Sequence, residues 1–242
     1  MSVRGFLLLA SLTLAQLPFP SAAVGQVAPR PQDASHPLLS GRNAAAAGLI
    51  LAVTLMSDEG LRGEVQEHRS AGTNSLALVG NALGEPRYVL PALGAGYLAG
   101  RLTGNHALSR VALRAGGAAI VAGGLTTALK YAIGRSRPYQ GGEADADQFR
   151  PFSGWNSFPS GHTTLAFAVA TAIADETSDR WSDAALYGVA TLTAFARVND
   201  DRHWTSDVLV GALIGHLSAR WLSRRQGWLT VGPGTIGTSL DF

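Results

Sequence analysis

The sequence predicts an all-α protein: a bundle of about six helices with a four-helix core and a possible short β-hairpin at the C-terminal end. Three observations predict this class. Hydrophobic residues make up 46% of the 242 positions and charged residues only 15%, which is enough for one domain with a sizeable buried core. The apolar segments are rich in Ala and Leu and lack the alternation typical of strands. Gly and Ala are abundant, which suits closely packed helices, in membranes especially.

The first 23 residues have the pattern of a secretory signal peptide. Arg4 supplies the positive start, residues 6–15 the apolar stretch, and Ser21, Ala22 and Ala23 a small-residue cleavage site. An uncleaved membrane anchor is the alternative. Residues 24–42, rich in Pro, Ser and Ala, indicate a linker. With either N-terminus we expect an exported protein that is periplasmic or membrane-associated, with its site on the periplasmic side.

The helical domain is expected over residues 43–226, with its functional core at about 107–223. Six apolar segments predict its helices: 44–56, 88–99, 111–129, 163–174, 184–196 and 207–221. Residues 139–158 form a long loop of the kind that is often functional. In the tail, residues 227–242, a Gly-Pro-Gly turn between short Thr, Val, Ile and Leu runs suggests the hairpin.

The sequence leaves open whether these helices cross a membrane. A span needs about 20 mostly apolar residues, and segments of about 10–14 are more often core helices. Most segments here are short, and the longest contains Arg114. Both a membrane-associated bundle and a soluble helical domain fit this pattern.

Charge and cysteine content exclude several function classes. A net charge of +2 without a long basic run does not indicate a nucleic-acid partner. The absence of cysteine excludes disulfides and thiolate chemistry. Asp58 and Glu59 follow a predicted helix and are expected to be solvated, as is Glu64. Asp145 and Asp147 lack the spacing of a calcium loop, so we expect no metal site.

Polar residues gather where the last four predicted helices begin or end. Lys130 and Arg197 end two of them, His162 precedes a third, and His203 and Asp207 open the fourth. Because the helices of an up-and-down bundle alternate in direction, all of these positions fall at one end. Cations, histidines and a carboxylate at one place predict a phosphate-binding site.

Local spacing supports this prediction. Lys130, the only lysine, lies seven residues before Arg137, and Pro138 disfavours helix at that arginine. Ser160 and Gly161 lead into a helix, whose free N–H groups and positive dipole end attract anions.

His203 and Asp207 are four residues apart, so a helical turn brings them together. A carboxylate bound to one imidazole nitrogen fixes the tautomer and leaves the other nitrogen free to attack. The sequence therefore predicts a histidine nucleophile.

These residues resemble the signature of the type 2 phosphatidic acid phosphatase superfamily, which includes acid phosphatases, lipid phosphatases and vanadium haloperoxidases. The signature has three parts in fixed order, and the resemblance covers residues 111–221. The matching residues are Lys130 with Arg137 and Pro138; Pro159, Ser160, Gly161 and His162; and Arg197, His203 and Asp207.

The resemblance implies a phosphatase for phosphate monoesters, of lipid, isoprenoid or small-molecule type, that needs no metal or other cofactor. His203 would form a phosphohistidine, Asp207 would orient it, and His162 would protonate the leaving alcohol. The residues implied in holding the phosphate oxygens are Lys130, Arg137, Ser160, Gly161 and Arg197.

The chain departs from the signature at one position, and two other functions stay open. Ala196 stands where the family usually has Ser, which removes a hydroxyl donor and lowers the expected turnover. A vanadium-dependent haloperoxidase would use the same anion pocket, and a non-enzymatic helical membrane protein would have no use for it.

The aromatic residues of the long loop have two interpretations. Phe149, Phe152, Trp155 and Phe158 either pack into the core or form a rim that grips a lipid chain.

Overall fold

The computed structural model describes residues 38, 40–140, 145–177, 179–225, 230–232 and 235–237. Its elements are α2 (Gly41–Glu67), α3 (Ala71–Leu83), α4 (Pro86–Leu102), α5 (His106–Ile133), the short 3₁₀ helix η1 (Pro138–Gln140), α6 (Gly161–Ala174), α7 (Arg180–Asn199), α8 (Thr205–Arg224), β1 (Thr230–Gly232) and β2 (Thr235–Gly237). The predicted signal peptide and most of the predicted linker lie outside the described residues.

The all-α prediction is confirmed, and each of the six apolar segments lies within a helix. The described residues contain seven α-helices, because α3 was not predicted. Its sequence carries Gly, Thr, Asn and Ser, which weaken an apolar pattern. A capping box between Ser70 and Thr73 starts the helix, and packing against α7 holds it. The predicted hairpin is present as β1 paired antiparallel with β2.

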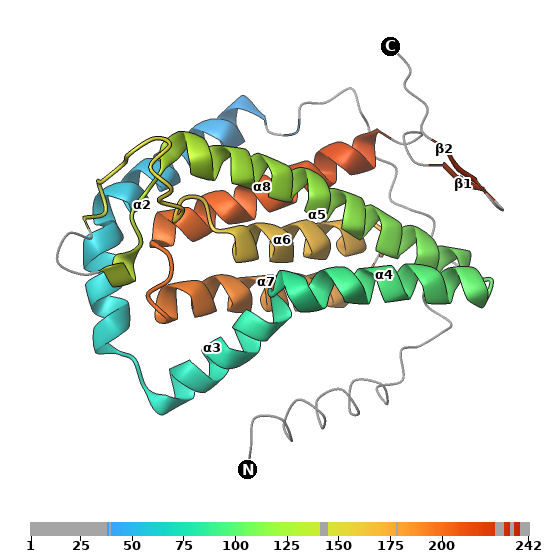
Figure 1. Ribbon diagram of the computed structural model, residues 1–242, viewed down its shortest axis with the longest axis horizontal. Coiled ribbons are helices and arrows are strands. Elements are labelled where there is room, and N and C mark those ends of the chain that lie inside the picture. Colours follow the sequence, from blue (N-terminus) through green and yellow to red (C-terminus); the bar gives the residue numbers. More distant parts are fainter. Residues whose placement is uncertain are drawn as a thin grey trace.

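Helix α6 is the centre of the bundle and packs against α5, α7 and α8 (Figure 1). Small residues allow this close packing: the core is built mainly from alanines of α5 and α6 together with Ile214 and Ala219 of α8. A Cβ atom at Gly211 would lie 2.6 Å from the carbonyl oxygen of Ser160. Glycine at this position therefore lets α8 approach the start of α6.

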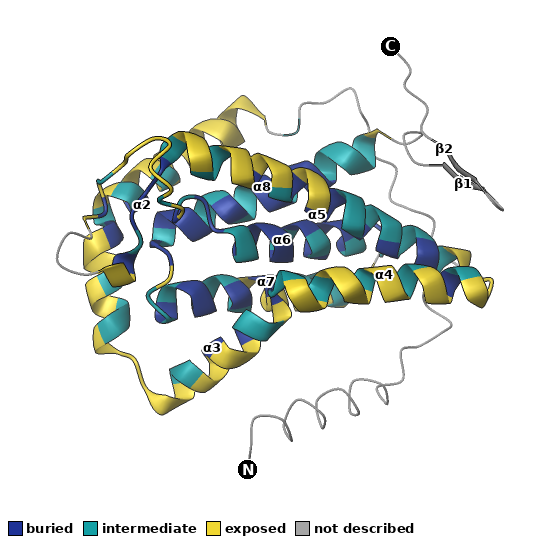
Figure 2. Cartoon of the chain, in the orientation of Figure 1, coloured by how far each residue is buried: buried dark blue, intermediate teal, exposed yellow. Residues whose placement is uncertain are grey.

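Helices α2, α3 and α4 cover the core only in part. They pack against α8, α7 and α5 respectively, and their outer faces are exposed in Figure 2. Large apolar side chains lie on these faces, among them Met56 at 88% exposure and Leu102 at 87%. On α5, Ile120 is 75% exposed.

By length and composition, α2 and α5 are the two described helices that meet the requirements for crossing a membrane. The core helix of a soluble protein also meets these requirements.

Candidate active site

His203 and Asp207 form a buried pair at the start of α8. His203 is 3% exposed, Asp207 is fully buried, and Nδ1 of the imidazole lies 3.3 Å from Oδ2 of the carboxylate. Burial lowers the pKa of His203 to about 3 against the opposing effect of Asp207. The imidazole is therefore neutral at ordinary pH. With Nδ1 bound to the carboxylate, Nε2 keeps a free lone pair.

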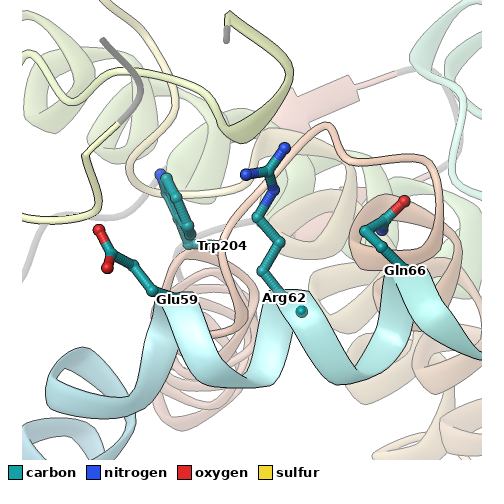
Figure 3. A pocket seen from close by; sticks show the side chains of 5 residues that line it. Glu59, Arg62, Gln66 and Trp204 are labelled. Atoms are coloured by element: carbon teal, nitrogen blue, oxygen red, sulfur yellow. The ribbon is translucent and has the colours of Figure 1, made fainter. Parts of the chain in front are cut away.

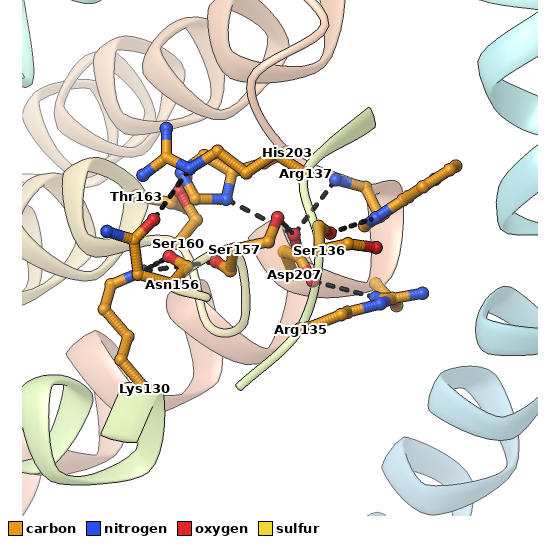
Figure 4. Close-up of polar contacts among 12 residues, drawn as sticks. Lys130, Arg135, Ser136, Arg137, Asn156, Ser157, Ser160, Thr163, His203 and Asp207 are labelled. Atoms are coloured by element: carbon orange, nitrogen blue, oxygen red, sulfur yellow. Dashed lines mark hydrogen bonds and ion pairs between the residues drawn. The ribbon is translucent and has the colours of Figure 1, made fainter. Parts of the chain in front are cut away.

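Asp207 is held from several sides (Figure 4). Oδ1 accepts from Nη1 of Arg135 at 2.8 Å, and Oδ2 accepts from the Ser157 hydroxyl at 2.5 Å and the Trp204 amide at 3.0 Å. Burial alone would raise the pKa of Asp207, but the hydrogen bond from His203 and the charge of Arg135 lower it overall. The carboxylate therefore stays ionised and fixed in orientation.

Asp58 of α2 belongs to the same buried network. Its carboxylate accepts from Nη2 of Arg135 at 2.8 Å and from the amide of Ser206 at 2.9 Å. Asp58 is 1% exposed, so the prediction of a solvated side chain was wrong. The pairing links positions 77 and 148 residues apart, and no local pattern signals such contacts. Arg135 was not predicted either. Its position two residues before Arg137 is the one sequence feature that points to it.

Two predicted phosphate-binding cations meet at the loop before α6. Nζ of Lys130 donates to the carbonyl oxygens of Asn156 at 2.5 Å and Ser157 at 3.2 Å. Nε of Arg137 donates to the side-chain oxygen of Asn156 at 2.9 Å. Since Ser157 also binds Asp207, this loop joins both cations to the His203 pair.

Arg197 of α7 supplies the third cation. Its Nη1 donates to the side-chain oxygen of Asn81 at 2.5 Å. Its Nε is buried and has no hydrogen-bond partner among the described residues. A buried donor gains from a partner, so this atom is available to donate to a bound anion. Asn81, which the sequence did not single out, also donates to Asp200 at 2.7 Å and so connects α3 to the end of α7.

The start of α6 lies against the same site. Ser160 precedes the helix, and its amide donates to the carbonyl oxygen of Asp207 at 3.0 Å. Its hydroxyl is fully buried and contacts Thr163 at 3.0 Å. A Cβ atom at Gly161 would lie 3.9 Å from Cε of Lys130. The positive end of α6 therefore lies beside Lys130, as an anion site requires.

His162 differs from His203 in its surroundings. Its side chain is 26% exposed, and Nε2 lies 3.6 Å from a carboxylate oxygen of Glu85. Burial and the charge of Arg197 lower the pKa of His162, whereas Glu85 raises it. The structure thus places one shielded, neutral histidine and one accessible, titratable histidine at the same end of the bundle.

Ala196, the position that departs from the family signature, is fully buried. A Cβ atom at Gly80 would lie 3.0 Å from the Cβ of Ala196 and would overlap the carbonyl of Leu192. The small side chains at both positions let α3 pack closely on α7 and bring Asn81 to Arg197.

None of the four loop aromatics is fully buried in the core, and Trp155 and Phe158 are half-buried. Phe152 is 79% exposed and Phe149 is 42% exposed, so neither is a core residue. The Arg135 guanidinium lies 5.2 Å from the Phe149 ring centroid, and Arg150 lies 4.5 Å from that of Trp155.

A cavity of about 450 Å³ lies beside the network, lined by Glu59, Arg62, Gly63, Gln66 and Trp204 (Figure 3). Trp204 forms part of its wall, but the predicted phosphate-binding residues do not line it.

Asp145 and Asp147 shape a turn, in which the Asp147 amide donates to Oδ1 of Asp145 at 2.8 Å. Across the described ranges, no three His, Asp or Glu side chains gather in a way that would hold a metal ion.

Comparison with known families matches residues 111–230 to the PAP2 superfamily. One curated relative is the lipid A 1-phosphatase of Porphyromonas gingivalis, 42% identical over 106 residues. The aligned part covers 42% of this chain and 21% of the relative, so the match spans about a fifth of that protein's length.

Two solved structures share the fold. LpxE of Aquifex aeolicus superposes with a TM-score of 0.54 at 22% identity, over 69% of this chain and 94% of that one. The transmembrane PAP2 type phosphatidylglycerolphosphate phosphatase of Bacillus subtilis superposes with a TM-score of 0.52 at 20% identity, over 74% and 93% of the two chains. The helical arrangement is therefore that of PAP2 type proteins.

Proposed function

Because the chain belongs to the PAP2 superfamily, we propose that it is a phosphatase that hydrolyses phosphate monoesters through a phosphohistidine on His203. One observation carries this proposal: among the described residues, the three cations Lys130, Arg137 and Arg197 donate to neutral oxygens, at the end of the bundle that holds the neutral imidazole of His203. Such cations are available for the charge of a phosphoryl group.

The proposed reaction has two steps. Nε2 of His203 attacks phosphorus, the bond to the leaving oxygen breaks, and His162 gives that oxygen a proton. Water then attacks the phosphohistidine, His162 takes up the proton of this water, and phosphate leaves with His203 restored. Asp207 holds the imidazole throughout, and the three cations bind the equatorial oxygens in both transition states.

We propose a phosphorylated lipid as the substrate. The Porphyromonas gingivalis relative is named for lipid A and the Bacillus subtilis neighbour for phosphatidylglycerol phosphate, so both names denote dephosphorylation of a lipid. The apolar outer faces of α2, α4 and α5 and the exposed Phe152 support a position at a lipid surface. Isoprenoid diphosphates and small phosphomonoesters are the other classes to compare.

We also propose that the protein is exported and membrane-associated, with the site on the periplasmic side. The signal-peptide pattern and the two apolar helices α2 and α5 support this location. N-terminal sequencing of the mature protein is expected to find cleavage near Ala23. An intact Met1 on an active cytosolic enzyme would contradict export.

The experiment that tests the function is a phosphate-release panel over lipid phosphates, isoprenoid diphosphates and small phosphomonoesters, with and without detergent. We expect release from at least one lipid phosphate at a rate well above that from small phosphomonoesters. Failure to release phosphate from every substrate by protein that remains folded would reject the proposal. Bromide oxidation with vanadate and peroxide would point to the haloperoxidase class instead.

A further inference from the structure

Glu85 occupies the position just before α4, yet it does not act as a helix cap. Residues that favour this position are Ser, Thr, Asp and Asn, whose short side chains bind the first free amides. Glu85 makes no such bond, and Pro86, the first residue of the helix, already marks its start. Helix α4 therefore takes no cap hydrogen bond from Glu85, and its dipole, which favours a negative charge at the helix start, does not require the carboxylate to turn in any one direction.

The carboxylate of Glu85 turns instead towards the candidate active site. Oε2 lies 3.6 Å from Nε2 of His162 and 3.1 Å from Nη2 of Arg87. The side chains of Glu85 and His162 are 23% and 26% exposed, whereas that of Arg87 is 72% exposed. Solvent screens the pair with Arg87 more strongly than the pair with His162.

The separation of 3.6 Å is longer than a hydrogen bond. Nε2 therefore stays available to donate to an incoming oxygen, while the carboxylate acts on the imidazole through its charge. Burial would raise the pKa of Glu85, but Arg87 and His162 lower it overall, so the carboxylate is ionised at neutral pH.

The other groups around His162 oppose its protonation. Burial has the largest effect, and Arg197 of α7 and Arg137 of the loop add positive charge; all three lower the pKa. Lys130 of α5 ends beside Gly161, next to His162. Of the charges that raise this pKa, Glu85 has the largest effect.

A phosphate-binding site thus disfavours the protonated form of the histidine that is proposed as its general acid. The cations that hold the phosphoryl group make a nearby imidazolium less stable. An alcohol leaves only when it receives a proton, so the histidine that supplies the proton needs a compensating negative charge.

We propose that Glu85 is a positioning residue that favours the protonated form of His162 against the surrounding cations, so that His162 can protonate an alcohol leaving group. The inference rests on the proposed phosphatase function and on the acid role of His162. It extends that function, because activity on alkyl and lipid phosphates would then depend on a carboxylate outside the family signature.

The test compares Glu85→Gln with the wild-type enzyme over a range of pH. One unit of pKa changes the protonated fraction tenfold, and a single charge at this distance shifts a pKa by about one unit or more. On an alkyl phosphate we expect the basic limb of the kcat/KM profile to move down by about one pH unit. On nitrophenyl phosphate, whose leaving group needs no proton, we expect little change. Glu85→Asp, which keeps the charge, is expected to retain part of the wild-type profile.

Glu64→Gln is the matched control, since Glu64 pairs with His68 on the surface at 3.4 Å with 71% exposure. It is expected to leave both profiles unchanged. Equal losses on both substrates without a pH shift in Glu85→Gln would overturn the proposal, because a purely structural role of Glu85 at the start of α4 predicts that result.

An NMR titration of His162 separates this inference from the function itself, since it needs no turnover. We expect a lower pKa of His162 in Glu85→Gln than in the wild type. An unchanged pKa overturns the proposal whatever the activity. A lowered pKa with an unmoved alkyl-phosphate profile confirms the coupling and contradicts the acid role of His162.

Discussion

Buried charged side chains are paired differently at the two ends of the bundle. At the end away from His203, each buried carboxylate has its own arginines. Asp175 accepts from Arg220 at 2.7 Å, and Glu176 pairs with Arg110 at 3.1 Å and with Arg114. These pairs tie α5 and α8 to the end of α6. Each of these arginines is paired with a carboxylate, so the groups stabilise the fold and leave little to bind a ligand.

At the His203 end the balance is positive. In the part of the chain that the structure describes, the hydrogen-bond acceptors of Lys130, Arg137 and Arg197 are neutral oxygens of Asn156, Ser157 and Asn81. Within the described ranges, no carboxylate lies at ion-pair distance from any of the three. Pairing therefore distinguishes a structural charge from a binding charge, because cations held only by neutral groups still attract an anion.

The largest expected effect comes from the nucleophile. His203→Asn keeps a polar side chain of similar size but removes the nitrogen that attacks phosphorus. We expect activity to fall by about 10³-fold or more, with the thermal unfolding temperature close to that of the wild type. The measurement is phosphate release together with a melting curve. His68→Asn on the exposed surface is the control, and retention of more than a thousandth of the activity by His203→Asn would contradict covalent catalysis.

The next prediction compares one arginine from each end of the bundle. Arg197→Ala is expected to lower kcat/KM by about 10²- to 10³-fold, because one donor to the transition state is lost. We expect a small change in stability, because loss of the hydrogen bond to Asn81 is offset by removal of a buried donor without a partner among the described residues and of the repulsion from Arg137. Arg220→Ala is expected to do the reverse and lower the free energy of unfolding by about 2 kcal/mol, typical of hydrogen bonds to charged groups. Ser223, which also binds Asp175 at 2.7 Å, limits that loss.

Activity assays and urea unfolding of both variants check whether Arg197→Ala loses mainly activity and Arg220→Ala mainly stability. A large activity loss in Arg220→Ala at full stability would contradict the assignment of Arg220 as a structural charge. A stability loss in Arg197→Ala as large as that in Arg220→Ala would contradict the assignment of Arg197 as a binding charge.

The positive end is also expected to bind a five-coordinate oxyanion. Vanadate resembles the transferring phosphoryl group, and analogues of the transition state bind more tightly than substrates by about 10²-fold or more. We expect competitive inhibition by vanadate well below KM, weakened in Lys130→Ala and Arg137→Ala. We also expect EDTA to leave activity unchanged. Activity lost in EDTA and restored by Mg²⁺ or Zn²⁺ would assign the chemistry to a metal site instead.

The sequence predicted those parts of the fold that depend on local pattern. Apolar runs located six helices, and the Gly-Pro-Gly turn located the hairpin. The missed helix, α3, depends on tertiary packing: Gly80 allows contact with the backbone of Leu192, a partner more than a hundred residues away. Propensity alone does not report such contacts.

Local spacing likewise predicted the pairing of His203 with Asp207, since four residues make one helical turn. The residues that hold the site were not predicted. Asp58, Asn81 and Glu85 come from α2, α3 and the start of α4, and each meets its partner across a long sequence separation. A single sequence carries no signal for these pairs.

The smallest effect is expected for a paired arginine at the His203 end itself. Arg62 of α2 binds Asp201 through two hydrogen bonds of 2.7 Å each, two residues before His203. It lines the cavity of Figure 3 rather than the phosphate site. If pairing rather than position decides the role of a charge, Arg62 is structural although it lies close to the site.

Arg62→Ala is therefore expected to lower the free energy of unfolding by about 1 kcal/mol or less, because its side chain is 35% exposed and solvent screens the pair. The difference from the wild type should shrink in 1 M salt. Activity should stay within about threefold, since hydrogen bonds from the Tyr139 amide to Asp201 at 3.1 Å and from the His203 amide to Arg197 at 3.2 Å still hold the loop. Urea unfolding at two salt concentrations and phosphate release provide the measurements. A loss of activity as large as that of Arg197→Ala would mean that paired cations also serve catalysis here, and that pairing does not separate the two kinds of charge.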